Sequence, residues 1–194
     1  METLVLVLLP LLFSMLLIGV FRSKIRSNII AISMTFISFS ISLFFLISRF
    51  YEQESYNWFN IHTYTFSISL SGNGLSLIMA TFVSLISLIV LIFSGFYIRN
   101  GKQERYYFEM SLFIFSMLGL VLSSSLLLFY IFWELISLSS YLLINFWYKS
   151  NKATISARKV FFFTRIGDIS LLVAISVLFL LFGTFNIQYI VNNI

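Results

Sequence analysis

Three ionisable residues lie inside apolar stretches of this 194-residue sequence. Glu134 is the only charged residue in IFWELISLSSYLLINFW (131–147), and Arg165 and Asp168 stand three positions apart in KVFFFTRIGDIS. An ionised side chain deep in an apolar helix is costly unless it is paired or hydrated, so such residues usually face a bundle interior or a water-filled cavity. The chemistry that a buried acid such as Glu134 favours is therefore proton transfer.

Polar residues accompany Glu134 at helical spacing. Tyr130, Ser137, Tyr141 and Asn145 fall on one predicted helix face with it, forming a polar stripe. Burial favours the neutral acid, whereas a nearby cation favours the carboxylate. A cation that moves would therefore let Glu134 load and release a proton. The alternative is a protonated Glu134 that hydrogen-bonds between helices and only stabilises packing.

The other charges have simpler interpretations. Arg165 and Asp168 are neighbours on one helix face, and we expect an ion pair. The alternative to a functional role is that the pair only fixes the orientation of its helix. Glu109, beside Arg105 near the inner end of its apolar segment, is expected to be an interfacial charge.

Composition places the chain in a membrane. Hydrophobic residues make up 60% of the sequence, 24 residues are Phe, 10% are charged, and the mean hydropathy is +1.01. Soluble globular domains do not have this composition. Because the sequence has no cysteine and only one histidine, His62, disulfides and thiolate metal sites are excluded, and we expect no zinc or haem site built by this chain alone.

The net charge of +5 does not predict nucleic-acid binding, because the basic residues lie between apolar segments. The beginning, METLVLVLLPLLFSM, has no basic residue before its apolar stretch. We therefore expect a membrane helix there, and not a cleavable signal peptide.

Six segments are long and apolar enough to be membrane spans. They are approximately residues 4–21, 29–48, 74–98, 106–122, 126–148 and 160–182. SSS at 123–125 is the predicted break within a run that is too long for one crossing. The predicted fold class is an all-α polytopic membrane protein with about six transmembrane helices and a short extracytoplasmic strand region. It divides into residues 1–48 (two N-terminal helices), 49–73 (outer loop with strand) and 74–194 (helices three to six and an outer tail).

Basic residues alternate between the two sides of this predicted bundle. One side collects Arg22, Lys24, Arg26, Arg99, Lys102, Arg105, Lys149, Lys152, Arg158 and Lys159. On the other side, loop 49–73 has only Arg49, offset by Glu52 and Glu54. By the positive-inside rule the basic side is the cytoplasm or the mitochondrial matrix, which predicts that both termini lie on the outer side.

Loop 49–73 has a strand pattern. In HTYTFSISL (62–70) bulky residues alternate with Ser and Thr, and SGNG (71–74) follows as a turn. We expect a strand or hairpin over the outer face of the bundle, with a plain ordered loop as the alternative.

Four stretches together resemble a known family. They are GNGLSLIMATFVSLISLIVLIFSGFYI, LLLFYIFWELISLSSYLLINFWY, ARKVFFFTRIGDISLLVAI and FGTFN. In order and spacing they resemble the antiporter-like subunit 5 (chain L) of respiratory NADH:quinone oxidoreductase, complex I. The resemblance covers about residues 60–190, and WE followed by SYLLI and TRIGD is its specific part. Related chains occur in Mrp-type cation/proton antiporters, membrane-bound hydrogenases and inorganic-carbon uptake complexes.

The resemblance implies a proton channel built from inverted five-helix repeats, with a Glu on the fifth helix facing a Lys on the seventh. Glu134 matches that Glu, and Arg165 and Asp168 match a charged pair on the sixth helix associated with charge coupling. Residues 74–194 would begin the first repeat. This chain would hold no cofactor, and the whole complex would use NADH, FMN, iron–sulfur clusters and quinone.

The sequence departs from the family by ending before the seventh helix, so the partner Lys and the outlet half are missing. We therefore expect the N-terminal part of a split or truncated subunit, with another chain supplying the rest. Other expected partners are the remaining membrane-arm subunits and membrane lipids. The Phe-, Ile-, Ser- and Asn-rich composition favours the mitochondrial inner membrane, and a prokaryotic plasma membrane is the alternative.

Three functional hypotheses follow. The first is a subunit of a proton-translocating NADH:quinone (ubiquinone) oxidoreductase of the respiratory electron-transport chain, with no redox site in this chain. The second is a subunit of an Mrp-type cation/proton antiporter or related ion-uptake complex. The third is a non-conducting membrane scaffold.

Overall fold

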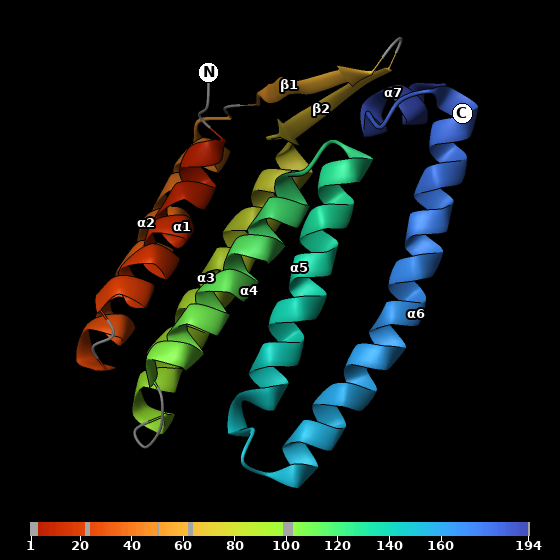
Figure 1. Cartoon of the computed structure of the whole chain (residues 1–194). Coiled ribbons are helices and arrows are strands. Elements are labelled where there is room, and N and C mark those ends of the chain that lie inside the picture. The colour runs from red at the N-terminus through yellow and green to blue at the C-terminus, as the bar shows by residue number, and fades with distance from the viewer. Residues whose placement is uncertain (1–3, 22–23, 50, 62–63, 99–102, 194) are drawn as a thin grey trace.

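The computed structural model describes residues 4–21, 24–49, 51–61, 64–98 and 103–193. It is a bundle of antiparallel helices capped at one end by a β-hairpin (Figure 1). The elements in chain order are α1 (Val5–Phe21), α2 (Lys24–Ile47), β1 (Gln53–Ile61), β2 (Tyr64–Ser71), α3 (Gly74–Tyr97), α4 (Gln103–Leu122), α5 (Leu126–Ile144), the 3-10 turn η1 (Asn145–Trp147), α6 (Asn151–Phe182) and α7 (Ile187–Asn192).

Five of these helices, α2 to α6, are long and apolar enough to cross a membrane. Helix α1 is equally apolar but shorter, with 17 residues. All six predicted apolar segments are helical, and α4 and α5 are separated by Ser123–Ser125 as the SSS break predicts. The all-α membrane fold with a small strand region is therefore confirmed.

The helix ends are divided between the two ends of the bundle as the charge pattern predicts. The last residues of α1, α3 and α5 and the first residues of α2, α4 and α6 lie at one end of the bundle (Figure 1). The hairpin strands, the α4–α5 connection and α7 lie at the other end. The helix ends that flank the basic connections therefore share one end. Four residues used in the sequence analysis lie outside the described part of the chain, namely Arg22, His62, Arg99 and Lys102.

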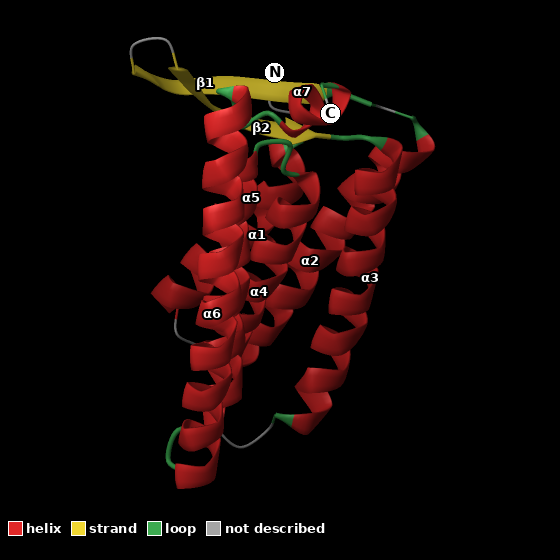
Figure 2. Cartoon of the chain, turned by 90° about the vertical axis from the view of Figure 1, so that its right-hand side faces the viewer, coloured by secondary structure: helices red, strands yellow, loops and turns green. Residues whose placement is uncertain are grey.

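Small and hydroxyl side chains bring the first four helices close together. Ser14 of α1 and Ser111 of α4 share a buried hydrogen bond of 2.9 Å between their Oγ atoms, and Ser38 of α2 donates to the carbonyl oxygen of Val7 at 2.6 Å. Such contacts are common between membrane helices, where small residues permit close approach and a buried hydroxyl needs a partner. Helix α6 packs mainly against α5 and η1 at the edge of the bundle (Figures 1 and 2).

Backbone hydrogen bonds tie together the end of the bundle that carries the hairpin, which the charge pattern predicts to be the outer end. Ser124 donates its N–H to the carbonyl oxygen of Ser69 in β2 at 2.9 Å, and Ile187 donates to that of Ser124 at 3.1 Å. Leu126 donates to the carbonyl oxygen of Phe185 at 2.8 Å. We call this set of bonds, made by residues 124–126 with β2 and with the 185–187 segment, the outer clasp. It joins the hairpin, the start of α5 and the chain that follows α6 (Figure 2).

Two elements differ from the sequence-based expectation. Helix α6 begins at Asn151, and not near residue 160. Its first turns carry exposed Lys152, Arg158 and Lys159, so the helix continues past the apolar stretch that marks the predicted span. The strand pattern also predicted only the second strand of the hairpin, because β1, QESYNWFNI, does not alternate regularly and contains a register shift near Asn57.

Candidate functional site

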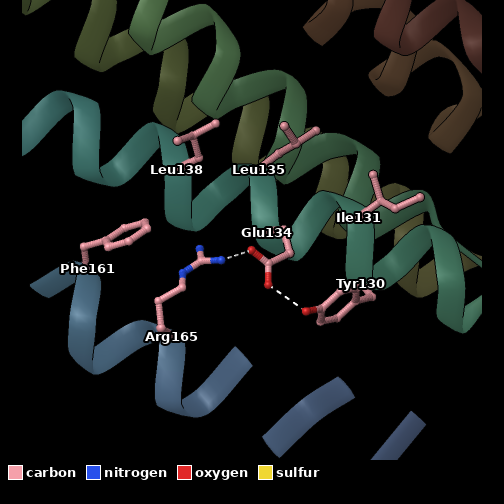
Figure 3. Close-up of a pocket in the computed structure, with 7 residues that line it drawn as sticks. All are labelled: Tyr130, Ile131, Glu134, Leu135, Leu138, Phe161 and Arg165. Carbon is pink, nitrogen blue, oxygen red and sulfur yellow. Dashed lines mark hydrogen bonds and ion pairs between the residues drawn. The ribbon is translucent and has the colours of Figure 1, made fainter. Parts of the chain in front are cut away.

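Glu134 lies between a donor on its own helix and a cation on the next (Figure 3). Tyr130, one turn earlier on α5, donates its hydroxyl proton to Glu134 Oε1 at 2.8 Å. Arg165 of α6 forms an ion pair with Glu134 through Nη1 and Oε2. Each carboxylate oxygen of Glu134 therefore has its own hydrogen-bond donor.

The guanidinium of Arg165 is shared with a second acid. Its Nη2 lies 3.2 Å from Asp168 Oδ2, which is the ion pair that the three-residue spacing predicts. Its central carbon lies 4.7 Å from the centroid of the Phe161 ring, one turn earlier on α6. The planar fork of an arginine can contact two carboxylates at once, and its face can stack on an aromatic ring.

A residue that the sequence analysis quoted only as part of the WE motif, without a role of its own, completes the cluster. Trp133 of α5 donates its indole N–H to Asp168 Oδ1 at 2.8 Å. The contacts thus connect, in order, Tyr130, Glu134, Arg165, Asp168 and Trp133. A neutral donor stands at each end of this series, and the two acids stand on either side of the arginine. We call these five residues the α5–α6 charge cluster.

The two acids differ in burial. The Asp168 side chain is 4% exposed, whereas the side chains of Glu134 and Arg165 are 26% and 29% exposed. Glu134 and Arg165 line a cavity of about 390 Å³ with the other residues drawn in Figure 3. A cavity of this size, with polar groups in its wall, has room for several water molecules or for a side chain from another helix.

Charge does not balance within the α5–α6 charge cluster. Glu134 and Asp168 can each carry a negative charge, and Arg165 alone carries a positive one. In an apolar surrounding an uncompensated carboxylate is unfavourable. An additional positive charge would offset this excess, and Glu134 is the acid that faces the cavity.

The rest of the predicted polar stripe also lies toward α6. The Tyr141 ring packs against that of Phe161 with centroids 5.2 Å apart, and Asn145 Oδ1 accepts a hydrogen bond from Thr154 Oγ1 at 3.3 Å. Ser137 is half-buried between Glu134 and Tyr141 on α5. The structure thus brings together the acids, the arginine and most of the stripe at one helix pair.

Glu109, expected from the sequence to be an interfacial charge, is buried within the bundle. It is 2% exposed, and Arg105 donates from Nε to its Oε1 at 2.6 Å. The Arg105 guanidinium in turn lies 5.2 Å from the centroid of the Tyr148 ring, just after η1. The chain that follows α5 therefore packs against the start of α4, a long-range contact that hydropathy does not reveal.

Among the described residues, no three or more His, Asp or Glu side chains group as ligands for a metal ion. The polar chemistry at the α5–α6 charge cluster is that of acids, an arginine and neutral donors.

Two family models match the chain. The model described as NADH-Ubiquinone oxidoreductase (complex I), chain 5 N-terminus, matches residues 58–108. The model described as NADH:quinone oxidoreductase/Mrp antiporter, TM, matches residues 123–194, which include the whole α5–α6 charge cluster.

Two relatives of known sequence belong to different assemblies. The chain is 37% identical over 190 residues to NADH-quinone oxidoreductase subunit L of Buchnera aphidicola subsp. Schizaphis graminum (strain Sg), covering 94% of this chain and 31% of that protein. It is 39% identical over 145 residues to the antiporter subunit mnhA2 of Staphylococcus aureus (strain MSSA476), covering 74% of this chain and 18% of that protein. The chain therefore spans less than a third of the length of these curated relatives.

Two solved structures share the fold. A chain of the Mrp complex from Dietzia sp. DQ12-45-1b superposes with a TM-score of 0.80 at 25% identity, over 97% of this chain and 20% of that one. A chain of the membrane-bound sulfane sulfur reductase, an archaeal respiratory membrane complex, superposes with a TM-score of 0.78 at 18% identity, over 94% and 28% of the two chains. Both neighbours come from membrane complexes.

Proposed function

The chain belongs to the antiporter-like family shared by complex I subunit L and Mrp antiporter subunits, and from this premise we propose that it is part of the proton-translocating membrane arm of a respiratory NADH:quinone oxidoreductase. In this proposal Glu134 binds the transported proton, and Arg165 and Asp168 control when it does so. Redox chemistry with NADH and quinone takes place in other subunits.

The observation that carries the proposal is that two acids share Arg165 beside a cavity. While Arg165 Nη1 contacts Glu134 Oε2, the carboxylate is stabilised as an anion. When Arg165 withdraws to Asp168, Glu134 loses its counter-charge and takes a proton on the oxygen that Arg165 has left. Tyr130 keeps its hydrogen bond to the other oxygen. Return of the guanidinium favours release of that proton.

A second cation would make this cycle directional. The excess acid in the α5–α6 charge cluster and the cavity beside Glu134 suit an ammonium group supplied by polypeptide beyond these 194 residues. Its approach to Glu134 would free Arg165 for Asp168. We propose that residues 74–194 form the start of the first antiporter-like repeat and that further membrane-arm polypeptide covers the exposed side of α6.

The direct test replaces Glu134 by Gln in the assembled complex. In closed vesicles we expect proton translocation to fall by at least about tenfold, while the chain remains in the membrane with its partners. Glu104→Gln, in the first turn of α4 and away from the cluster, is the matched control. Unchanged stoichiometry and turnover in Glu134→Gln would remove Glu134 from the path. Loss of assembly with normal transport in the surviving complex would favour the scaffold hypothesis.

An Mrp-type antiporter is the second candidate. It is favoured by the 39% identity to the S. aureus antiporter subunit and by the fold shared with the Dietzia Mrp complex. Purification under mild conditions separates the two candidates. NADH-oxidising partner chains support the respiratory complex, whereas antiporter subunits together with sodium-dependent growth support the second function.

The membrane orientation is part of the proposal, with the basic end inside and the hairpin outside. Because the sequence has no cysteine, single cysteines can be introduced at exposed Tyr56 in β1 and at exposed Lys152 in α6. An impermeant thiol reagent should label Tyr56→Cys in right-side-out vesicles and Lys152→Cys in inverted ones. The reverse pattern would overturn the orientation.

A further inference from the structure

Trp133 lies beside the proposed proton site without lining its cavity. Its side chain is partly exposed and stacks on Phe129, with ring centroids 6.0 Å apart and planes 22° from parallel. Its indole N–H nevertheless crosses to α6 and reaches Asp168 Oδ1 at 2.8 Å. A tryptophan that served only to fill space would not need this polar contact.

The contact has a specific geometric effect. Trp133 and Glu134 are consecutive on α5, and they hold Asp168 and Arg165, which are three positions apart on α6. Because the indole occupies Oδ1, the other oxygen of Asp168 is left for Arg165 Nη2, 3.2 Å away. Asp168 is nearly buried, so an anion there depends strongly on the few donors that reach it.

We propose that Trp133 is a positioning residue that acts through Asp168. It holds the Asp168 carboxylate as the competing acceptor for Arg165, so that the guanidinium is divided between two acids. Without the indole donor, the Asp168 carboxylate is no longer held with Oδ2 toward Arg165, and the guanidinium stays on Glu134, which slows proton loading. This inference rests on the proposed function of Glu134, and it gives a role to Trp133, which does not line the cavity.

The contact itself is tested by spectroscopy on the purified assembled complex. The ultraviolet resonance Raman band that reports indole N–H hydrogen bonding should differ between the wild type and Asp168→Asn, because Asn presents a neutral and weaker acceptor or its amide N–H₂. The difference should disappear when both samples also carry Trp133→Phe. A wild-type-minus-Asp168→Asn spectrum without an indole signal overturns the inference. This first comparison uses only proteins that keep Trp133, so it does not require that Trp133→Phe assembles.

Coupling to transport is tested by a double-mutant cycle. We expect Trp133→Phe to lower the translocation rate by about tenfold, because a hydrogen bond to an ionised carboxylate is lost. In the Asp168→Asn background the same substitution should change the rate by less than about twofold. Trp147→Phe, at an exposed tryptophan in η1, is the control, and Trp133→His should recover part of the rate by restoring a ring N–H.

The outcomes separate the two proposals. Equal losses from Trp133→Phe in both backgrounds would mean that Trp133 does not act through Asp168, and the inference would be wrong even where Glu134→Gln abolishes translocation. Normal translocation in Glu134→Gln would overturn the proposed function whatever the Raman result.

Discussion

Glu134 and Arg165 form an ion pair between α5 and α6 although 31 positions separate them in the sequence. The guanidinium also lies 3.2 Å from Asp168, so one cation serves two acids. A pair with a single partner would be a static link between helices. A shared cation has two favourable positions, and motion between them is what a proton relay requires.

Replacing Arg165 tests this sharing. Arg165→Lys keeps the charge, but an ammonium lacks the planar fork that reaches two carboxylates. We expect a loss of about tenfold in translocation rate for Lys and a larger loss for Gln, which leaves two acids without a counter-charge. Arg158→Gln, exposed on the same helix, is the control. Proton uptake by closed vesicles during turnover is the measurement, and a normal rate in Arg165→Gln would contradict the mechanism.

Replacing Tyr130 tests the second donor to Glu134. Tyr130→Phe removes the 2.8 Å hydrogen bond to Oε1 and leaves the ring in place. Because a hydrogen bond to a charged group contributes about 1.5 kcal/mol or more, we expect a fall of roughly tenfold in translocation rate. Tyr141→Phe is matched in chemistry and lies on the same helix face, where its ring packs on Phe161. Equal effects of the two substitutions would show that the Tyr130 hydroxyl has no special role.

The close approach of α4 and α5 depends on Gly119. A Cβ built there would lie 2.3 Å from the Phe132 ring, so Gly119→Ala forces the two helices or the ring to move. We expect a loss of about 1–3 kcal/mol of stability, seen as a lower thermal unfolding midpoint. Gly167→Ala is the control, since nothing lies within 4 Å of the added Cβ, and it should stabilise α6 by about 0.5–1 kcal/mol. A Gly119→Ala protein as stable as the wild type would refute this packing.

The outer clasp can be weakened without disturbing α5. Leu126 is the first residue of that helix, where proline is well tolerated, and Ser125 before it already has extended backbone angles. Leu126→Pro removes the N–H that Phe185 accepts, whereas Leu126→Ala keeps it. Hydrogen exchange at residues 185–192 should become faster in Leu126→Pro only. Equal exchange in the two variants would show that this bond does not restrain α7.

The sequence predicts most of this fold because apolar length and basic connections are local properties. They locate the helices and the SSS connection, and they predict that the basic connections share one end of the bundle. The start of α6 was missed because Lys152, Arg158 and Lys159 continue the helix beyond its apolar stretch. A strand or hairpin was expected in loop 49–73, but the position of the first strand was not located because the alternating pattern is weak in β1.

Only the part of the candidate site that depends on spacing within one helix could be predicted, because such spacing is a local property of the sequence. The spacing of Arg165 and Asp168 indicates a pair on one helix, and the stripe through Glu134 indicates a face. Which residues meet across helices is a tertiary property. The sharing of Arg165 with Glu134 and the hydrogen bond from Trp133 to Asp168 therefore came only from the structure, as did the burial of Glu109.

The excess of one acid over cations in the α5–α6 charge cluster has an electrical consequence. A membrane potential acts on every charge within the bilayer, with about 2.3 kcal/mol per elementary charge for each 100 mV crossed. A proton that reaches Glu134 from either surface crosses only part of that field. The occupancy of this carboxyl group should therefore respond to voltage as well as to proton concentration, so that the energised state of the membrane itself helps to set how often the site is filled.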